Sequence, residues 1–273
     1  KKEDDKVLVY ASTYYYTELS CAKMLLELDS AVDYFPTEEE RAQEEEFRES
    51  ILKKLVSLEQ NLDLELDELQ QLAVLESVLH GVFLLTGGPG TGKTTIIKTA
   101  ITIMQKEDLD VALCAPTGRA AKRIAETTGE EAKTLHRLLE LGKTLEDEIE
   151  LGYNVAKIDK DVVIVDEMSM VDSILFEKLL RALRLGCRLI MVGDFHQLPS
   201  VGAGNLLKDI IASKCVPVVE LTEIFRQAQK SLIVTNAHRI VSGEYPDLSR
   251  KDNDFFFFCR DDYDKAVRLI VDL

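Results

Sequence analysis

The sequence lacks several features that mark special classes of protein. No apolar run approaches the roughly 18 residues of a membrane-spanning helix. The five cysteines are scattered and form no CxxC pair, which argues against a disulfide framework and a structural zinc site. We expect each to be a small buried side chain in a reducing, cytosolic compartment. The chain opens with lysine and has no signal-peptide core, so we expect a fragment of a longer protein.

Size and composition indicate a globular protein. The 273 residues are 46% apolar and 30% charged, enough for one large domain or two small ones. The net charge of −16 argues at first against a nucleic-acid partner. However, residues 1–80 hold 8 basic and 20 acidic side chains, whereas residues 81–273 hold 25 and 29. The second part is therefore close to neutral and has room for a local basic strip.

Residues 1–61 are predicted to form a small helical region. Apolar residues recur at helical spacing over 12–30. Residues 37–60 are strongly acidic with one apolar stripe, which predicts a solvated helix. A third predicted helix, at 67–80, leads into the next part of the chain.

From residue 81 the pattern changes to short apolar runs separated by helical segments. The apolar runs lie at 82–86, 110–114, 161–166, 187–193 and 216–221. The helical segments lie at 92–106, 117–127, 134–141, 171–184 and 204–213. This alternation predicts an α/β fold, a parallel sheet with helices on both faces and ligands at the carboxyl ends of its strands. The run 255–258 is predicted to be one more buried strand.

The first functional pattern is a phosphate-binding loop. Residues 87–94 match GxxxxGK[ST], directly after an apolar run and at the start of a helix. Glycines let main-chain N–H groups turn toward a phosphate, Lys93 would reach the β- and γ-phosphates, and the Thr94 hydroxyl would bind Mg²⁺. The alternative is a glycine-rich turn without a ligand. The predicted nucleotide-binding residues are Gly87, Gly88, Pro89, Gly90, Thr91, Gly92, Lys93, Thr94 and Thr95.

A second pattern is a pair of carboxylates, Asp166 and Glu167, at the end of an apolar run. Asp166 would hold Mg²⁺, and Glu167 would polarise the attacking water. An exposed acidic strand end is the alternative interpretation, and the phosphate loop in the same chain disfavours it.

Two further residues are candidates for sensing and stabilising the reacting phosphate. Gln197 follows the predicted strand 187–193 and is placed to contact the γ-phosphate. Arg226 would supply positive charge to the phosphoryl transition state. Taken alone, each is better explained as a surface residue.

Six blocks occur together and in order: GGPGTGKTT (87–95), APTGRAAKR (115–123), TLHRLL (134–139), VIVDEMSMVD (163–172), VGDFHQLPSVGAGNLL (192–207) and LTEIFRQ (221–227). This set resembles the RecD-like superfamily 1 DNA helicases, relatives of the exodeoxyribonuclease V alpha subunit that move 5′ to 3′ on single strands. The resemblance covers residues 62–273, and residues 7–31 resemble the segment before the motor in longer members.

The resemblance implies a RecA-like P-loop ATPase domain at 62–273 that uses ATP and Mg²⁺ and acts as a helicase. It implies that Gln70 contacts adenine and that Lys93, Glu167, Gln197 and Arg226 are catalytic. The residues that it implies for gripping the DNA backbone are Pro116, Thr117, Gly118, Arg119, Thr134 and His136. On residue chemistry alone, Arg119 is a solvated charge and His136 a core or capping histidine.

One departure from the family concerns the second motor domain, whose motifs do not follow residue 227. The resemblance therefore implies that this chain is the first motor domain, with single-stranded DNA and the missing second motor domain as partners. It further implies a bacterial cytoplasmic, nucleoid-associated protein without a membrane partner, whose repair or recombination partners are unknown. We expect weak nucleotide binding, slow hydrolysis and no unwinding by the chain alone.

Two rival functions remain. One is another P-loop ATPase, of the AAA+ or kinase-like type, which the block at 193–199 disfavours. The other is a nucleotide-gated DNA-binding module without useful turnover.

Overall fold

The computed structural model describes residues 2–3, 6–7, 9–32, 38–62, 65–141, 155–223, 230–250, 254–259 and 262–272. The chain divides into two compact units. The first comprises Lys1–Gly87 and Gly92–Thr222, and the second comprises Gly88–Thr91 and Glu223–Leu273.

A six-stranded parallel sheet forms the centre of the first unit, with strand order β5-β4-β6-β7-β3-β8. The strands are β3 (Val82–Gly87), β4 (Val111–Ala115), β5 (Ala132–Thr134), β6 (Val162–Val165), β7 (Arg188–Gly193) and β8 (Val218–Leu221). The predicted parallel sheet is confirmed. The three-residue strand β5 was not predicted, because it lacks an apolar run. A separate antiparallel pair joins β1 (Lys2–Glu3) and β2 (Lys6–Val7).

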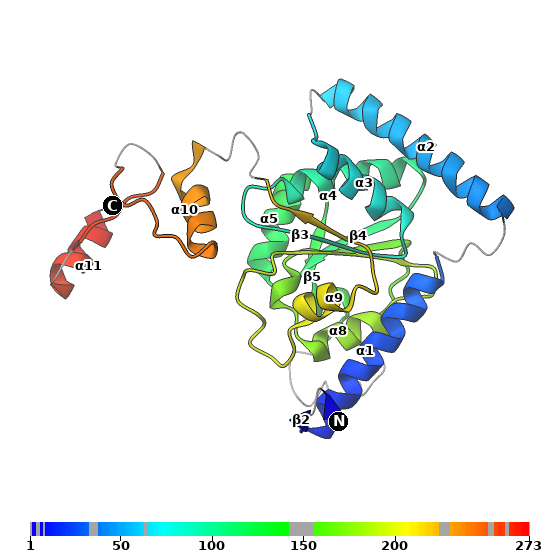
Figure 1. Ribbon diagram of the computed structural model, residues 1–273, viewed down its shortest axis with the longest axis horizontal. Coiled ribbons are helices and arrows are strands. Elements are labelled where there is room, and N and C mark those ends of the chain that lie inside the picture. The colour runs from blue at the N-terminus through cyan, green and yellow to red at the C-terminus, as the bar shows by residue number, and fades with distance from the viewer. Residues whose placement is uncertain are drawn as a thin grey trace. The chain divides into compact units, whose positions relative to one another are not determined.

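Helices cover both faces of the sheet, as predicted (Figure 1). One face packs on α1 (Ser12–Ser30), α6 (Leu135–Leu138), α8 (Ser173–Ala182) and α9 (Leu206–Ser213). The other packs on α2 (Glu38–Leu62), α3 (Glu68–Leu79), α4 (Lys93–Lys106) and α5 (Gly118–Thr128). Helix α6 is shorter than the predicted 134–141, since β5 takes its first residue and the helix ends at Leu138.

The apolar runs have no polar alternation because both faces of each strand are buried. In β3, Val82 and Leu84 join the core on one face, while Phe83 and Leu85 join the core on the other. This is the period-two geometry of a strand inside a three-layer domain.

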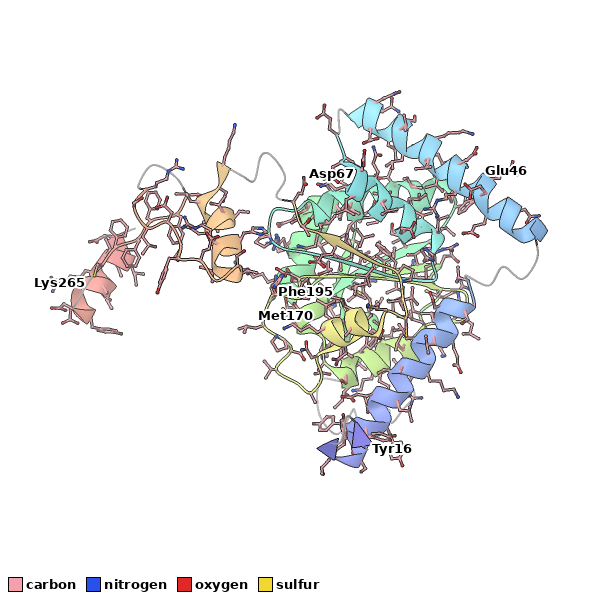
Figure 2. The ribbon with its side chains drawn as sticks, in the orientation of Figure 1. Tyr16, Glu46, Asp67, Met170, Phe195 and Lys265 are labelled. Carbon is pink, nitrogen blue, oxygen red and sulfur yellow. The ribbon has the colours of Figure 1, made fainter. Side chains whose placement is uncertain are left out.

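The first two helices contribute to these same cores. Cys21, Leu25 and Leu28 of α1 are buried on one face of the sheet. The apolar stripe of α2, which includes Ile51 and Leu55, is buried against the other. The acidic side of α2 is turned away from the core, as Glu46 illustrates (Figure 2). The division of the chain at residue 61 stays a prediction.

The second unit contains α10 (Leu232–Val241) and α11 (Tyr263–Asp272). Helix α10 is tied to the following segment, since the Asn236 amide exchanges two hydrogen bonds with the main chain of Asp247, at 3.1 and 2.7 Å. The prediction of a buried strand at Phe255–Phe258 is wrong. The segment is not a strand, and Phe257 is 50% exposed. Within the described part of the chain no strand pairs with it.

Three cysteines, Cys21, Cys114 and Cys187, are buried as predicted, whereas Cys215 and Cys259 are exposed, so the expectation of burial is wrong for these two. Cys215 lies in the loop after α9 rather than in the core. Among the described residues, no helix combines the length and apolar character needed to cross a bilayer.

Candidate nucleotide-binding site

The predicted catalytic residues of the first unit gather at the carboxyl ends of three adjacent strands. Strand β7 lies between β3 and β6 in the sheet. Register pairs Thr86 with Gly193 and Val165 with Met191, so the three strands end at one edge. The phosphate loop follows β3, and Asp166 follows β6. The structure therefore brings the loop lysine and the carboxylate pair to one edge from segments about 70 residues apart in sequence.

Lys93 is held at the beginning of α4 by the main chain that precedes the loop. Its Nζ donates to the Gly87 carbonyl at 2.6 Å. Gly92, the N-cap of α4, has φ of 93°, and a Cβ there would lie 2.5 Å from Nε2 of Gln70. The left-handed backbone is what favours glycine here, since the end of the Gln70 side chain could shift to make room for a Cβ. Thr94 and Thr95 stand half-buried in the first turn of α4, and the first turn of a helix is a common place for main-chain N–H groups to bind an anion.

The tip of the loop belongs to the second unit. Gly90 has φ of 75°, and the Thr91 hydroxyl donates to the Gly88 carbonyl at 2.9 Å. In the same unit, Nε2 of His238 lies 3.0 Å from the Pro89 carbonyl, which can only accept, so the ring nitrogen donates. A Cβ on Gly88 would lie 2.7 Å from Cε1 of His238.

Several charged side chains lie together in the poorly solvated region around Lys93 and Asp166. Burial lowers the pKa of Lys93, and the negative charges of Asp194, Asp166 and Glu167 oppose that shift. Burial raises the pKa of Asp166, and the neighbouring Glu167 raises it further. Shifts that arise from burial and from a like charge side by side are common at functional sites.

Glu167 departs from ordinary backbone geometry. Its φ and ψ are 55° and 43°, in the left-handed region that a glutamate rarely adopts. Its main-chain N–H donates to Oδ1 of Asp166 at 2.9 Å. Oε1 of Glu167 lies 3.8 Å from Nη1 of Arg123, on α5. A conformation of this kind costs about 1–3 kcal/mol and is typical of functional turns.

Gln197 is exposed on the turn after β7 and is linked to the segment that follows Glu167. The Ser169 hydroxyl donates to Oε1 of Gln197 at 3.3 Å. The turn itself is built on Asp194, whose carboxylate accepts from the His196 N–H and whose carbonyl accepts from the Gln197 N–H. Asp194 is only 4% exposed.

Gln70 is 2% exposed and lies against the phosphate loop. Asp67 and Gln70 form a capping box at the start of α3, in which the Gln70 amide oxygen accepts from the Asp67 N–H at 3.2 Å. Sequence reasoning assigned Gln70 to adenine and missed this capping bond. The adenine contact stays a prediction.

The predicted DNA contacts follow the neighbouring strands β4 and β5. Thr117 and Thr134 are the N-caps of α5 and α6, and each hydroxyl accepts a main-chain N–H at 3.2 Å. The remaining predicted contacts are Pro116, half-buried, and Gly118, Arg119 and His136, all exposed. Arg226 lies outside the described residues.

Three residues that sequence reasoning left unassigned belong to this region: Asp194, Ser169 and Arg123. Asp194 and Ser169 fall inside the quoted blocks, and their position after two adjacent strands was the available signal. Arg123 ends the quoted block 115–123, but a charge on an amphipathic helix is ordinary and gave no signal of its own.

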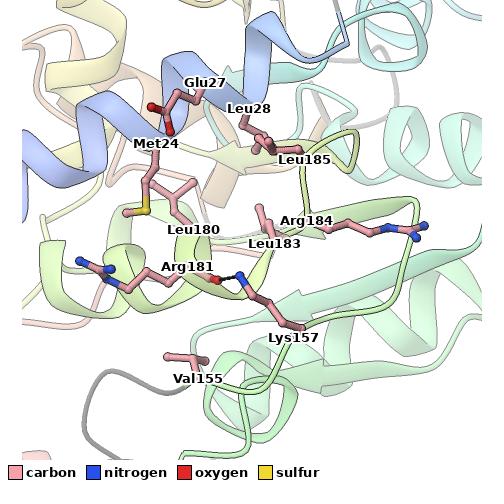
Figure 3. Close-up of a pocket in the computed structure, with 10 residues that line it drawn as sticks. All are labelled: Met24, Glu27, Leu28, Val155, Lys157, Leu180, Arg181, Leu183, Arg184 and Leu185. Carbon is pink, nitrogen blue, oxygen red and sulfur yellow. Dashed lines mark hydrogen bonds between the residues drawn. The ribbon is translucent and has the colours of Figure 1, made fainter.

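A separate pocket of about 420 Å³ lies between α1, α8 and the chain before β6 (Figure 3). Met24 and Leu180 line its apolar side, and Lys157 donates to the Arg181 carbonyl at 2.6 Å (Figure 3). None of the predicted site residues lines it.

Comparison with known proteins identifies the family of this chain. Residues 65–255 match the family described as AAA domain. The ATP-dependent RecD2 DNA helicase of Deinococcus radiodurans is 40% identical over 181 residues, which cover 65% of this chain and 24% of that protein. The RecBCD enzyme subunit RecD of Mycolicibacterium smegmatis is 37% identical over 168 residues, covering 53% of this chain and 30% of that protein.

Among solved structures, the Pif1 helicase from Candida albicans matches with a TM-score of 0.50 and 25% identity, over 72% of this chain and 50% of that one. The chain spans less than a third of either curated relative. The match and the sheet topology confirm the predicted RecA-like fold. The chain therefore belongs to the AAA domain family and is a motor domain of the RecD-like superfamily 1 helicase type.

Proposed function

We propose that the protein is an ATP-dependent DNA helicase that moves 5′ to 3′ on single-stranded DNA, and that this chain supplies its first, ATP-binding motor domain. The observation that carries the proposal is the meeting of Lys93, Asp166 and Glu167 at one edge of the sheet, where Lys93 and Asp166 are poorly solvated. The name of one relative, an ATP-dependent DNA helicase, supports the same function.

The residues present suit a nucleotide and Mg²⁺. The carboxylate of Asp166 and the hydroxyl of Thr94 are the hard oxygen donors that Mg²⁺ prefers. A bound Mg²⁺ would neutralise charge on the phosphates. Residues 87–95 present main-chain N–H groups and the Lys93 ammonium to the phosphates, and Gln70 stands beside this loop for the base.

The chemical step needs a base, a sensor and a positive charge. Glu167 accepts a proton from the attacking water, and its left-handed backbone aims it differently from Asp166. Gln197 contacts the γ-phosphate and passes its loss to the turn that it shares with Asp194. Arg226 stabilises the charge of the transferring phosphoryl group.

The DNA side consists of the blocks that follow β4 and β5. Thr117, Arg119 and His136, with Pro116, Gly118 and Thr134, hold the phosphate backbone without reading sequence. A second motor domain elsewhere in the protein completes the cleft, and closure of that cleft on ATP shifts the strand. By likeness to RecBCD subunits, DNA-processing proteins are the expected partners.

The test is ATP hydrolysis by the full-length protein with and without an oligonucleotide of thymidines. We expect stimulation by single strands, and we expect Glu167→Gln to bind ATP but stall. Parental turnover by Glu167→Gln would remove Glu167 from the role of base. Binding of both ligands without hydrolysis would favour a nucleotide-gated DNA-binding module instead. The 273-residue chain alone should not unwind duplex DNA; robust unwinding would contradict the need for a second motor domain.

A further inference from the structure

Arg123 connects the helix of a predicted DNA block to the predicted catalytic base. It lies on α5, whose N-cap is Thr117, and it follows Arg119 by four residues, so both side chains share one side of the helix. Its Nη1 lies 3.8 Å from Oε1 of Glu167. One side of α5 therefore carries two exposed arginines, Arg119 of the predicted DNA block and Arg123 beside the predicted catalytic base.

The guanidinium acts on the whole charged group rather than on Glu167 alone. Its positive charge lowers the pKa of Lys93 and also that of Asp166, although burial is the largest cause of the shift in each. Arg123 thus stands within electrostatic range of all three residues that the ATP reaction needs.

The ion pair is weak enough to be exchanged. The Arg123 side chain is 78% exposed, whereas that of Glu167 is 22% exposed. An ion pair with one solvated member contributes about 0.2–1 kcal/mol. A phosphate offers guanidinium two parallel hydrogen bonds, so it competes well for such a partner.

We propose that Arg123 is a positioning residue that restrains Glu167 while no DNA is bound, and that a phosphate of single-stranded DNA draws Arg123 away and frees the carboxylate to accept a proton from water. The inference rests on the proposed ATPase function and deepens it, because it names the link between DNA binding and hydrolysis. A carboxylate that pairs with a guanidinium is held to one orientation.

The test compares variants of the full-length protein in steady-state phosphate release, without DNA and with saturating oligonucleotide. Arg123→Gln should raise the DNA-free rate about two- to fivefold, the ratio of rates that corresponds to the free energy of the Arg123–Glu167 ion pair. The DNA-saturated rate should stay near parental, so the stimulation ratio falls by the same factor. Arg123→Lys keeps the positive charge and should remain close to the parent.

The matched control is Lys122→Gln. Lys122 is the preceding residue on α5, is equally exposed at 78%, and pairs with Glu126 rather than with the site. It should leave both rates unchanged. A merely structural role of Arg123 would lower both rates and would not raise the DNA-free one.

The outcomes separate the two proposals. A parent that DNA stimulates, together with an Arg123→Gln variant whose DNA-free rate equals the parental rate, overturns the role of Arg123 and leaves the helicase function standing. A parent that hydrolyses no ATP under either condition overturns the proposed function and this inference with it.

Discussion

Strand β3 and the segment Phe255–Phe258 are both apolar runs, but their surroundings differ. Phe83 is fully buried, because β7 and β8 pair with both edges of β3 and helices cover both faces. Phe257 is 50% exposed, and no described strand adjoins it. An apolar run therefore reports that a segment favours burial, not that the fold supplies neighbours to bury it.

The largest expected difference between these regions is in stability. Phe83→Ala should lower the free energy of unfolding by about 3–5 kcal/mol, because it leaves a cavity between packed layers. Phe257→Ala should change it by no more than about 0.5 kcal/mol. Urea unfolding followed by far-UV circular dichroism measures both, since the chain has no tryptophan. Equal losses would mean that the C-terminal segment is as well packed as the sheet.

Two lysine variants, one in the sheet domain and one in the C-terminal helix, compare the same two regions by their effect on ATP hydrolysis. Lys93→Ala should reduce ATP hydrolysis by about two to three orders of magnitude, the usual loss when one group that stabilises transition-state charge is removed. Lys265→Ala, on the exposed helix α11, is the matched control and should leave the rate unchanged (Figure 2). Phosphate release measures both. Parental hydrolysis by Lys93→Ala would place the ATP reaction elsewhere.

Buried charge at the edge of the sheet should cost stability that exposed charge does not. Asp166→Asn keeps a side-chain oxygen that can accept from the Glu167 N–H. It removes a carboxylate that is buried beside the carboxylate of Glu167. We expect the free energy of unfolding at neutral pH to rise by about 1 kcal/mol while hydrolysis is lost. Asp264→Asn, exposed on α11, should have little effect on either.

The pH dependence of that gain has a definite sign. The pKa of Asp166 is raised in the folded chain, so the folded state binds the proton more tightly than the unfolded state. Protonation removes the free-energy cost of burying the charged Asp166 carboxylate beside Glu167. The parent and Asp166→Asn should therefore approach equal stability below the ordinary pKa of aspartate, about 3.9. The difference should grow as pH rises toward the folded pKa and stay constant above it. A constant difference at all pH values would contradict a raised pKa.

Features with a local cause were predictable from the sequence. Buried strands such as β3 and β6 were recognisable because an unbroken apolar run needs both faces of the strand to be covered. The phosphate loop was recognisable because the backbone of the loop itself needs its glycines. Strand β5 was missed because a short edge strand needs few apolar residues. The left-handed backbone of Glu167 was not predictable because glutamate rarely adopts it, and the approach of Arg123 was not predictable because it depends on where α5 lies relative to β6. The burial expected of Phe257 depended on neighbours that sequence does not report.

The smallest expected contrast concerns two serines. Ser169 donates to Gln197 within the site, whereas Ser231 is the N-cap of α10, where its hydroxyl accepts from the Val234 N–H. Ser169→Ala removes one neutral hydrogen bond, so it should lower the free energy of unfolding by about 0.5–1.5 kcal/mol and kcat a fewfold, with little change in KM. Ser231→Ala should cost about 1 kcal/mol of local helix stability, seen as faster amide hydrogen exchange in α10. Because Gln197 is exposed, the bond to Ser169 is what distinguishes, within the described residues, a held sensor from a surface amide. An unchanged kcat in Ser169→Ala would mean that this bond does not hold Gln197 for the reaction.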